Sequence, residues 1–231
     1  MSTMEYSKRF RDVLELDGSP VGVSYHRVED IQQLDGRKTV CQLIQKARRG
    51  GKFFVTKDNM SCPGGAHYLG LIERVPRHED FLVELEKIFQ SPESAKRFFE
   101  VSPKPPLGLS YSVSFAPLEE TESADVVLFV CNPIQAMRII GLYTYESGAG
   151  PKNHLFGAAC QAAITSPMVT KELSVSFIDW TARKLGAYKP DEVIVGVPFS
   201  RLESMVDAIE KSTWGTAKPR YKVEDLLKFF R

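Results

Sequence analysis

Four cysteines are the residues of this chain with the clearest potential for chemistry. They occupy positions 41, 62, 131 and 160 of a 231-residue chain. Cysteine thiolates bind metal ions and iron–sulfur clusters, and they also act as nucleophiles. No two of the four are separated by only two residues, so the spacing disfavours a zinc ribbon and a thioredoxin-type redox pair. Ligands of a cluster can still converge from separate loops.

The surroundings of Cys41 and Cys62 favour a thiolate or a metal-bound sulfur. A capping box that begins at Thr39 places Cys41 in the first turn of a helix, where free N–H groups and the helix dipole stabilise negative charge. Cys62 precedes proline and two glycines. Gly64 and Gly65 let a cofactor approach the backbone, and their amides can hydrogen-bond sulfur. The alternatives are a small buried side chain for Cys41 and a plain turn for Cys62.

Cys131 and Cys160 carry weaker signals of the same kind. Cys131 ends an apolar run directly before the helix start Asn132-Pro133, and open sheets bind ligands at such junctions. A core cysteine explains this position equally well. Small residues surround Cys160, so either a neighbouring helix or a cofactor approaches it closely. We therefore expect Cys41, Cys62 and Cys160 to share one pocket, with Cys131 nearby or on its wall.

Other side chains extend or rival this interpretation. His67 could be a metal ligand or the general base for Cys62, or simply a half-buried strand histidine. Asp179 is expected to cap the helix that follows it, although strand ends also carry catalytic carboxylates. The remaining histidines lie in polar contexts and are expected to be exposed: His26, His78 and His154.

Strand-like and helix-like segments alternate along the whole chain. The periodicity predicts helices near residues 6–16, 40–48, 81–89, 92–99, 133–145, 157–165, 181–185, 200–211 and 223–230. It predicts strands near residues 21–25, 53–55, 66–72, 111–115, 126–130, 173–178 and 193–197. The expected fold is α/β or α+β, with a mixed sheet flanked by helices and helices at both termini. We expect a single domain over 1–231, with the proline-rich stretch 102–107 as an internal loop.

Composition narrows the function classes. The net charge of +1 provides no field that would attract nucleic acid or an anionic membrane. No segment approaches the roughly 20 apolar residues of a membrane span, and no apolar leader is present, so we expect a cytoplasmic protein. Thiols there are normally reduced, which favours metal ligands or catalysis over disulfides. Dinucleotide and P-loop glycine motifs are absent from the sequence.

In combination, these motifs resemble a prokaryotic family catalogued as domain of unknown function 169, the ArCR family. The resembling pieces are Cys41 with Ala47-Arg48 and Gly50-Gly51, the run from Ser61 to Ala66 with Leu69-Gly70, Asn132-Pro133 with Gln135-Ala136, Cys160, and Glu192 to Pro198. They cover most of the chain. The resemblance implies a free-standing cytoplasmic protein whose cysteines suggest iron–sulfur or redox chemistry, and it implies no particular reaction.

Our leading hypothesis is a redox or electron-transfer protein in which Cys41, Cys62, Cys131 and Cys160 bind a [4Fe-4S] cluster. Without Cys131, one iron would remain open for substrate. The first alternative is a metal-free enzyme with Cys62 as nucleophile and His67 as base. The second is a small-ligand-binding protein with structural cysteines. The expected partner is a redox protein or a small molecule, and a homo-oligomer is compatible with the sequence.

Overall fold

Six strands form one sheet that both halves of the chain build. The computed structural model describes residues 1–27, 37–152, 155, 157–218 and 221–230. The strands are β1 (Val21–His26), β2 (Phe53–Val55), β3 (Ser112–Pro117), β4 (Val126–Cys131), β5 (Ser174–Ser176) and β6 (Val193–Pro198), in the order β2-β3-β1-β4-β6-β5. Every pairing between these strands is antiparallel, so the expected mixed sheet is wrong in strand direction.

The mixed α/β fold with helices at both termini is confirmed. The helices are α1 (Thr3–Leu14), α2 (Val40–Ala47), α3 (Pro63–Tyr68), α4 (His78–Asp80), α5 (Pro92–Val101), α6 (Pro133–Thr144), α7 (Ser166–Thr170), α8 (Trp180–Gly186), α9 (Leu202–Lys211) and α10 (Val223–Phe229). Two π-helical segments are η1 (Phe81–Leu85) and η3 (Cys160–Thr165), and the 3-10 turns are η2 (Leu118–Glu120), η4 (Phe199–Arg201) and η5 (Thr213–Gly215). No helix within the described residues is long and apolar enough to cross a membrane.

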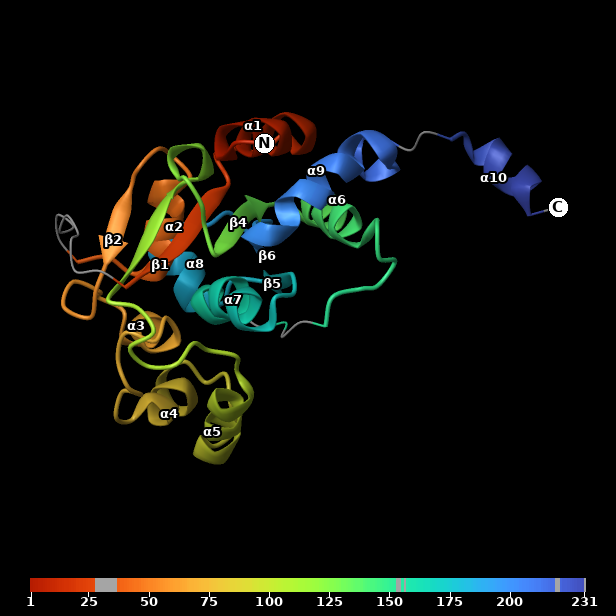
Figure 1. The fold of residues 1–231 in the computed structure, drawn as a ribbon. Helices are drawn as coiled ribbons and strands as arrows, with labels where there is room; N and C mark the ends of the chain where they lie inside the picture. The colour runs from red at the N-terminus through yellow and green to blue at the C-terminus, as the bar shows by residue number, and fades with distance from the viewer. Residues whose placement is uncertain (28–36, 153–154, 156, 219–220, 231) are drawn as a thin grey trace.

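Helices cover both faces of the sheet (Figure 1). One core packs α1, α6 and α9 against the sheet, and the other packs α2, α3, η3 and α8 against the opposite face. Alternation along β4 divides its side chains between the two cores. Val126, Leu128 and Val130 join the core of α2 and η3, whereas Val127, Phe129 and Cys131 join the core of α1, α6 and α9. Because Cys131 is an odd-numbered residue of β4, its side chain lies in the core of α1, α6 and α9.

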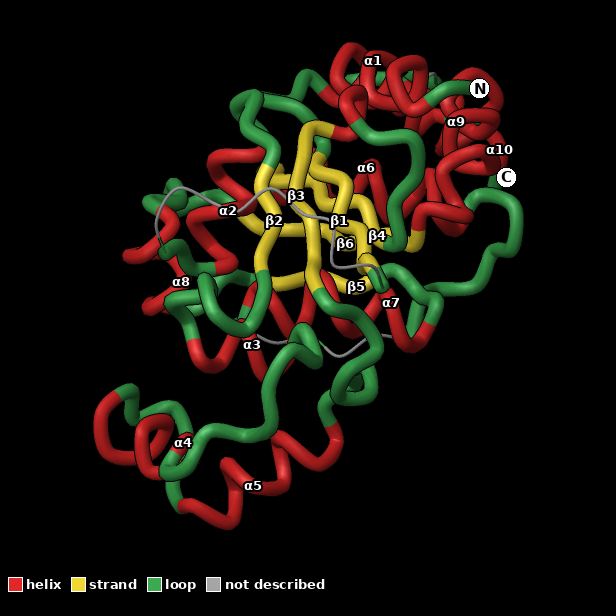
Figure 2. Tube along the Cα trace, turned by 60° about the vertical axis from the view of Figure 1, so that its left-hand side comes forward, coloured by secondary structure: helices red, strands yellow, loops and turns green. Residues whose placement is uncertain are grey.

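Residues 78–101, which comprise α4, η1 and α5, form a helical arm beyond the sheet. Figures 1 and 2 show α4 and α5 together at one end of the molecule, on the side of α3. The helix expected over 81–89 is confined to the π-helical turn Phe81–Leu85. The strand expected over 66–72 is wrong, because residues 63–68 form α3. The arm and α3 together enclose the space described below.

One glycine on β6 permits the close packing of η3 that positions Cys160. A Cβ atom at Gly196 would lie 1.9 Å from the carbonyl oxygen of Ala163 in η3. We expect Gly196→Ala to lower the free energy of unfolding by about 1–3 kcal/mol, the usual cost of overpacking. Gly150→Ala, whose Cβ would meet nothing within 4 Å, should change it by less than about 0.5 kcal/mol. Equal effects in urea denaturation would contradict this packing.

Candidate functional site: a pocket with three thiols

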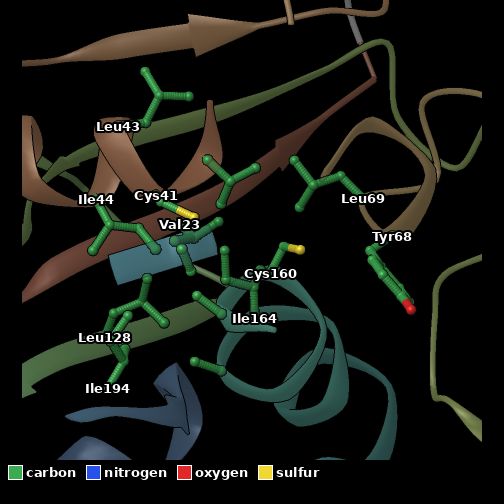
Figure 3. Packing of buried hydrophobic residues seen from close by; sticks show 14 of the residues in the cluster. Val23, Cys41, Leu43, Ile44, Tyr68, Leu69, Leu128, Cys160, Ile164 and Ile194 are labelled. Carbon is green, nitrogen blue, oxygen red and sulfur yellow. The ribbon is translucent and has the colours of Figure 1, made fainter. Parts of the chain in front are cut away.

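A pocket of about 500 Å³ lies between the sheet-bound helices and the helical arm. Three of the four cysteines line it, and each comes from a different element: Cys41 from α2, Cys62 from the start of α3 and Cys160 from η3. Figure 3 shows Cys41 and Cys160 on the same side of the sheet, beside Val23. The expectation that these three cysteines share a pocket is therefore confirmed.

The predicted capping box positions Cys41. The Thr39 hydroxyl accepts a hydrogen bond from the Gln42 amide at 3.3 Å, and the Thr39 amide donates to the Gln42 side chain at 3.0 Å. Cys41 is buried in the first turn of α2, as expected. Its carbonyl oxygen accepts a hydrogen bond from the hydroxyl of the buried Tyr188 at 3.1 Å. The thiol therefore stands at the positive end of the helix dipole.

Cys62 is the N-cap residue of α3, and it is the least buried of the four cysteines. Its Sγ accepts a hydrogen bond from the Gly65 amide at 3.3 Å. A Cβ atom at Gly65 would lie 2.7 Å from Cγ2 of Val40, so glycine lets α3 pack tightly against α2. Gly64 lines the pocket beside the ring of His78. The two glycines thus lie beside the thiol of Cys62, at the pocket where we expected a cofactor to approach the backbone.

Cys160 begins the π-helical segment η3 and is buried at the inner wall of the pocket. π-Helical turns are rare and frequently occur at functional sites. A Cβ atom at Gly157 would lie 2.7 Å from the Asp179 side chain, so the small residues before Cys160 do permit a close approach. The neighbour that approaches is the start of α8. Asp179 caps α8 by accepting a hydrogen bond from the Ala182 amide at 2.7 Å, as expected.

The three pocket thiols are free and neutral at physiological pH. Burial raises the pKa of Cys41, Cys62 and Cys160, and the mutual repulsion of their thiolates adds to the shift for Cys41 and Cys160. No disulfide joins any of the four cysteines. A metal that binds these sulfurs must displace their protons. Such displacement is favourable because metal–thiolate bonding outweighs the desolvation that disfavours a free thiolate.

Cys131 lies on the opposite face of the sheet, so its expected place beside the other three is wrong. It packs in the core of α1, α6 and α9, and it does not line the pocket. Burial raises its pKa to about 12, and the nearby charges of Arg48 and Glu192 act on it in opposite directions. The structure therefore brings three of the four candidate ligands together.

His67 lies within α3 but does not line the pocket. Its Nε2 atom is 3.3 Å from Nζ of Lys104, and its ring contacts Phe99. His78 lines the pocket instead, and it is half-buried rather than exposed. His26 is also half-buried, and its ring contacts Ser114 at 2.7 Å. His154 lies outside the described residues. The pocket thus contains a histidine, but not the one that the sequence suggested.

The environment of His67 predicts a loss of stability in acid. Burial, followed by the charge of Lys104, lowers the pKa of His67 to about 4 from 6.5. The unfolded chain therefore binds this proton more readily than the folded protein. The contribution of His67 is complete above about pH 6.5 and is lost as the pH falls toward 4. Urea denaturation should show that the free energy of unfolding falls less between pH 7 and pH 4.5 in His67→Gln than in the wild type. Equal losses would contradict this role.

Two acidic side chains in the pocket complete its polar wall. Asp179 and Glu86 both line it, and burial raises the pKa of each. Glu86 on the arm accepts a hydrogen bond from the hydroxyl of Thr181 on α8, which joins the two sides of the pocket. Sequence reasoning missed Glu86 and His78, because neither lies near a cysteine or in a recognisable motif. Only the fold brings them to the thiols.

Among the described residues, no three His, Cys, Asp or Glu side chains stand close enough to hold a single metal ion. A cubane cluster has a different requirement, because its thiolates bind separate irons and their sulfurs stand farther apart than around one ion. Three cysteines that line one pocket are of the residue type that ligates such clusters. They do not form a preassembled zinc site.

The comparisons identify the relatives of this chain. The model of the uncharacterised ArCR family, domain of unknown function 169, matches residues 9–208. The chain belongs to this family. A curated relative of the ArCR chain is Uncharacterized protein MJ0308 of Methanocaldococcus jannaschii, 28% identical over 218 residues, which cover 89% of this chain and 93% of the relative. No solved structure matches. The matched region contains all three pocket cysteines, whereas α10 lies beyond it.

Proposed function

We propose that this ArCR protein is an iron–sulfur protein in which Cys41, Cys62 and Cys160 hold a [4Fe-4S] cluster with one iron open to substrate. The observation that carries the proposal is the meeting of these three thiols in one pocket, although more than a hundred residues of sequence separate the first from the last. When bound, such a cluster supplies one-electron transfer and a Lewis-acidic iron.

The chain's own groups suit an anionic cluster. The Gly65 amide already donates a hydrogen bond to Sγ of Cys62, and hydrogen bonds to cluster sulfurs raise the reduction potential. Cys41 lies in the first turn of the eight-residue helix α2, whose dipole favours negative charge. Apolar side chains form much of the pocket wall around the thiols: Val75 before the arm, Phe81, Leu82, Ile88 and Phe98 on the arm, and Leu185 on α8.

A metal-free cysteine enzyme is less well supported. Cys62 is partly accessible, as a nucleophile must be, but burial raises its pKa and thus lowers the thiolate fraction at neutral pH. His67 does not line the pocket, and its Nε2 atom lies 3.3 Å from Nζ of Lys104, so the structure gives no support to its role as the base for Cys62. His78 is the only histidine among the lining residues, and burial lowers its pKa. A structural role for all four cysteines leaves the clustering of three of them unexplained.

The ultraviolet–visible spectrum of protein purified without oxygen tests the proposal. A cluster ligated by thiolates absorbs broadly in the blue and near-ultraviolet region. We expect this shoulder, and we expect it to bleach on reduction with dithionite. A colourless protein, even after reconstitution with iron and sulfide, would overturn the proposal. Rapid alkylation of a single thiol at neutral pH would then support the metal-free enzyme.

A further inference from the structure

We propose that the half of the pocket formed by the helical arm binds the uncharged aromatic ring of a small molecule beside the three thiols. With the proposed function, this molecule is the substrate of the open iron, so its role as substrate rests on that function. The binding itself depends only on the shape and chemistry of the pocket. It can therefore be tested in protein that contains no metal.

The volume of the pocket is larger than three thiol groups would occupy. About 500 Å³ lies within the range of sites that bury a small organic ligand, roughly 300–1,000 Å³. The thiols occupy the inner wall next to the sheet, and the arm supplies the outer wall. Side chains of this outer wall remain open although they are apolar: Phe81 is 38% exposed and Ile88 39%, and Leu185 of α8 facing them is 40% exposed. A ligand would cover these surfaces.

Aromatic rings form a large part of the outer wall. Tyr68 of α3 lines the pocket together with His78, Phe81 and Phe98 of the arm. The buried ring of Phe99 packs against three of these rings, with centroid distances of 4.8 Å to His78, 5.9 Å to Phe98 and 6.0 Å to Tyr68. His78 in turn contacts Phe81 at 6.3 Å. Rings that are fixed in this way present faces and edges to which a planar aromatic ligand is complementary.

The charges of the lining residues favour an uncharged ligand. Besides the thiols and Arg77, the ionisable side chains of the lining are the half-buried Asp179, Glu86 and His78 and the buried Tyr68. The two carboxyls would repel a carboxylate or phosphate. Arg77 is the cation of the lining, but its side chain is 76% exposed and pairs with Asp80 at 2.8 Å. Burial raises the pKa of both carboxyls and so disfavours their charged forms, which weakens this repulsion and the attraction of a cation alike; an uncharged ring depends on neither.

Titration of the full-length, metal-free protein with the neutral fluorescent probe N-phenylnaphthylamine tests this inference. We expect a saturable rise in fluorescence that phenol displaces better than cyclohexanol, its aliphatic counterpart of similar size. Phe81→Ala should weaken probe binding about 5- to 30-fold, because it removes one ring face and its apolar area. Leu85→Ala is the matched control: this residue is on the same turn η1, is 73% exposed and does not line the pocket. It should leave the affinity unchanged.

Two further measurements distinguish binding in the pocket from binding elsewhere on the protein. The probe should slow the alkylation of Cys62, which lines the same pocket, whereas the buried Cys131 should be unaffected. The exposed rings of Phe229 and Phe230 on α10 offer another apolar surface, so the double variant Phe229→Ser, Phe230→Ser should retain the probe site. Loss of binding in that double variant, or unchanged binding in Phe81→Ala, would overturn the inference. Because iron is absent throughout, neither result depends on whether a cluster forms.

Discussion

Alanine at Cys41, Cys62 or Cys160 should each reduce the iron bound by the reconstituted protein to background, whereas alanine at Cys131 should leave it intact. The first three cysteines line one pocket, and the fourth packs on the opposite face of the sheet. A cluster with three protein thiolates has no spare ligand, so the loss of any one opens a second iron and destabilises the whole assembly. We expect at least about a tenfold loss of iron in each of the three variants.

Cys131→Ala is a demanding control, because Cys131 is more buried than any of the three pocket cysteines. Its replacement removes a side chain from the core and should cost about 1–2 kcal/mol of stability without changing the bound iron. Iron analysis and thermal unfolding of all four variants therefore separate loss of a ligand from loss of packing. Equal iron loss in all four variants would contradict the three-thiol site. So would retention of iron in any one of the three pocket variants.

Glu192→Gln should produce the largest loss of stability, about 3–5 kcal/mol in the free energy of unfolding. Oε1 of Glu192 lies 2.6 Å from Nη1 of Arg48, and the two side chains are only 9% and 3% exposed. The second oxygen of Glu192 accepts a hydrogen bond from the Lys189 amide at 2.8 Å. Within the described part of the chain, removing the Glu192 charge leaves the buried Arg48 with only the more distant carboxylate of the exposed Asp17, at 3.7 Å, in a medium of low dielectric constant.

The same substitution at an exposed ion pair is the control. Glu100 pairs with Lys96 at 3.9 Å on α5, and the two side chains are 60% and 63% exposed. Glu100→Gln should change the free energy of unfolding by less than about 1 kcal/mol, because water screens exposed pairs. Urea denaturation of both variants near neutral pH makes the comparison. If Glu192→Gln cost no more than Glu100→Gln, the buried pair would not hold β6 to α2 as its geometry indicates.

Local signals in the sequence predicted the elements that carry the thiols, because capping is a local interaction. Thr39 forms the expected capping box, and Asp179 caps α8 as expected. The helix that contains His67 escaped detection because proline and two glycines, all weak helix formers, occupy its first turn. Strand direction also escaped detection, because alternating strands and helices do not reveal whether neighbouring strands run parallel or antiparallel.

The placement of Cys131 could not be predicted, because β4 is apolar at every position and buried on both faces. Alternation then provides no signal for which residues face which core. The sequence indicated a strand end before a capped helix, and both features are present. Alternation puts Cys131 on the same face as Val127 and Phe129, but only the packed fold shows that this face meets α1, α6 and α9 and not the pocket. The pocket, by contrast, depends on the arm, whose position no local pattern encodes.

The content of iron and acid-labile sulfide in protein reconstituted without oxygen tests the central claim most directly. A three-thiol cubane predicts about four irons and four sulfides per chain, and Cys131→Ala should bind the same amounts. Cyanide or another small ligand for the open iron should then perturb the spectrum of the bound cluster. Iron without sulfide, or zinc bound in place of iron at one ion per chain, would contradict the account. So would a protein that binds neither iron nor sulfide under these conditions.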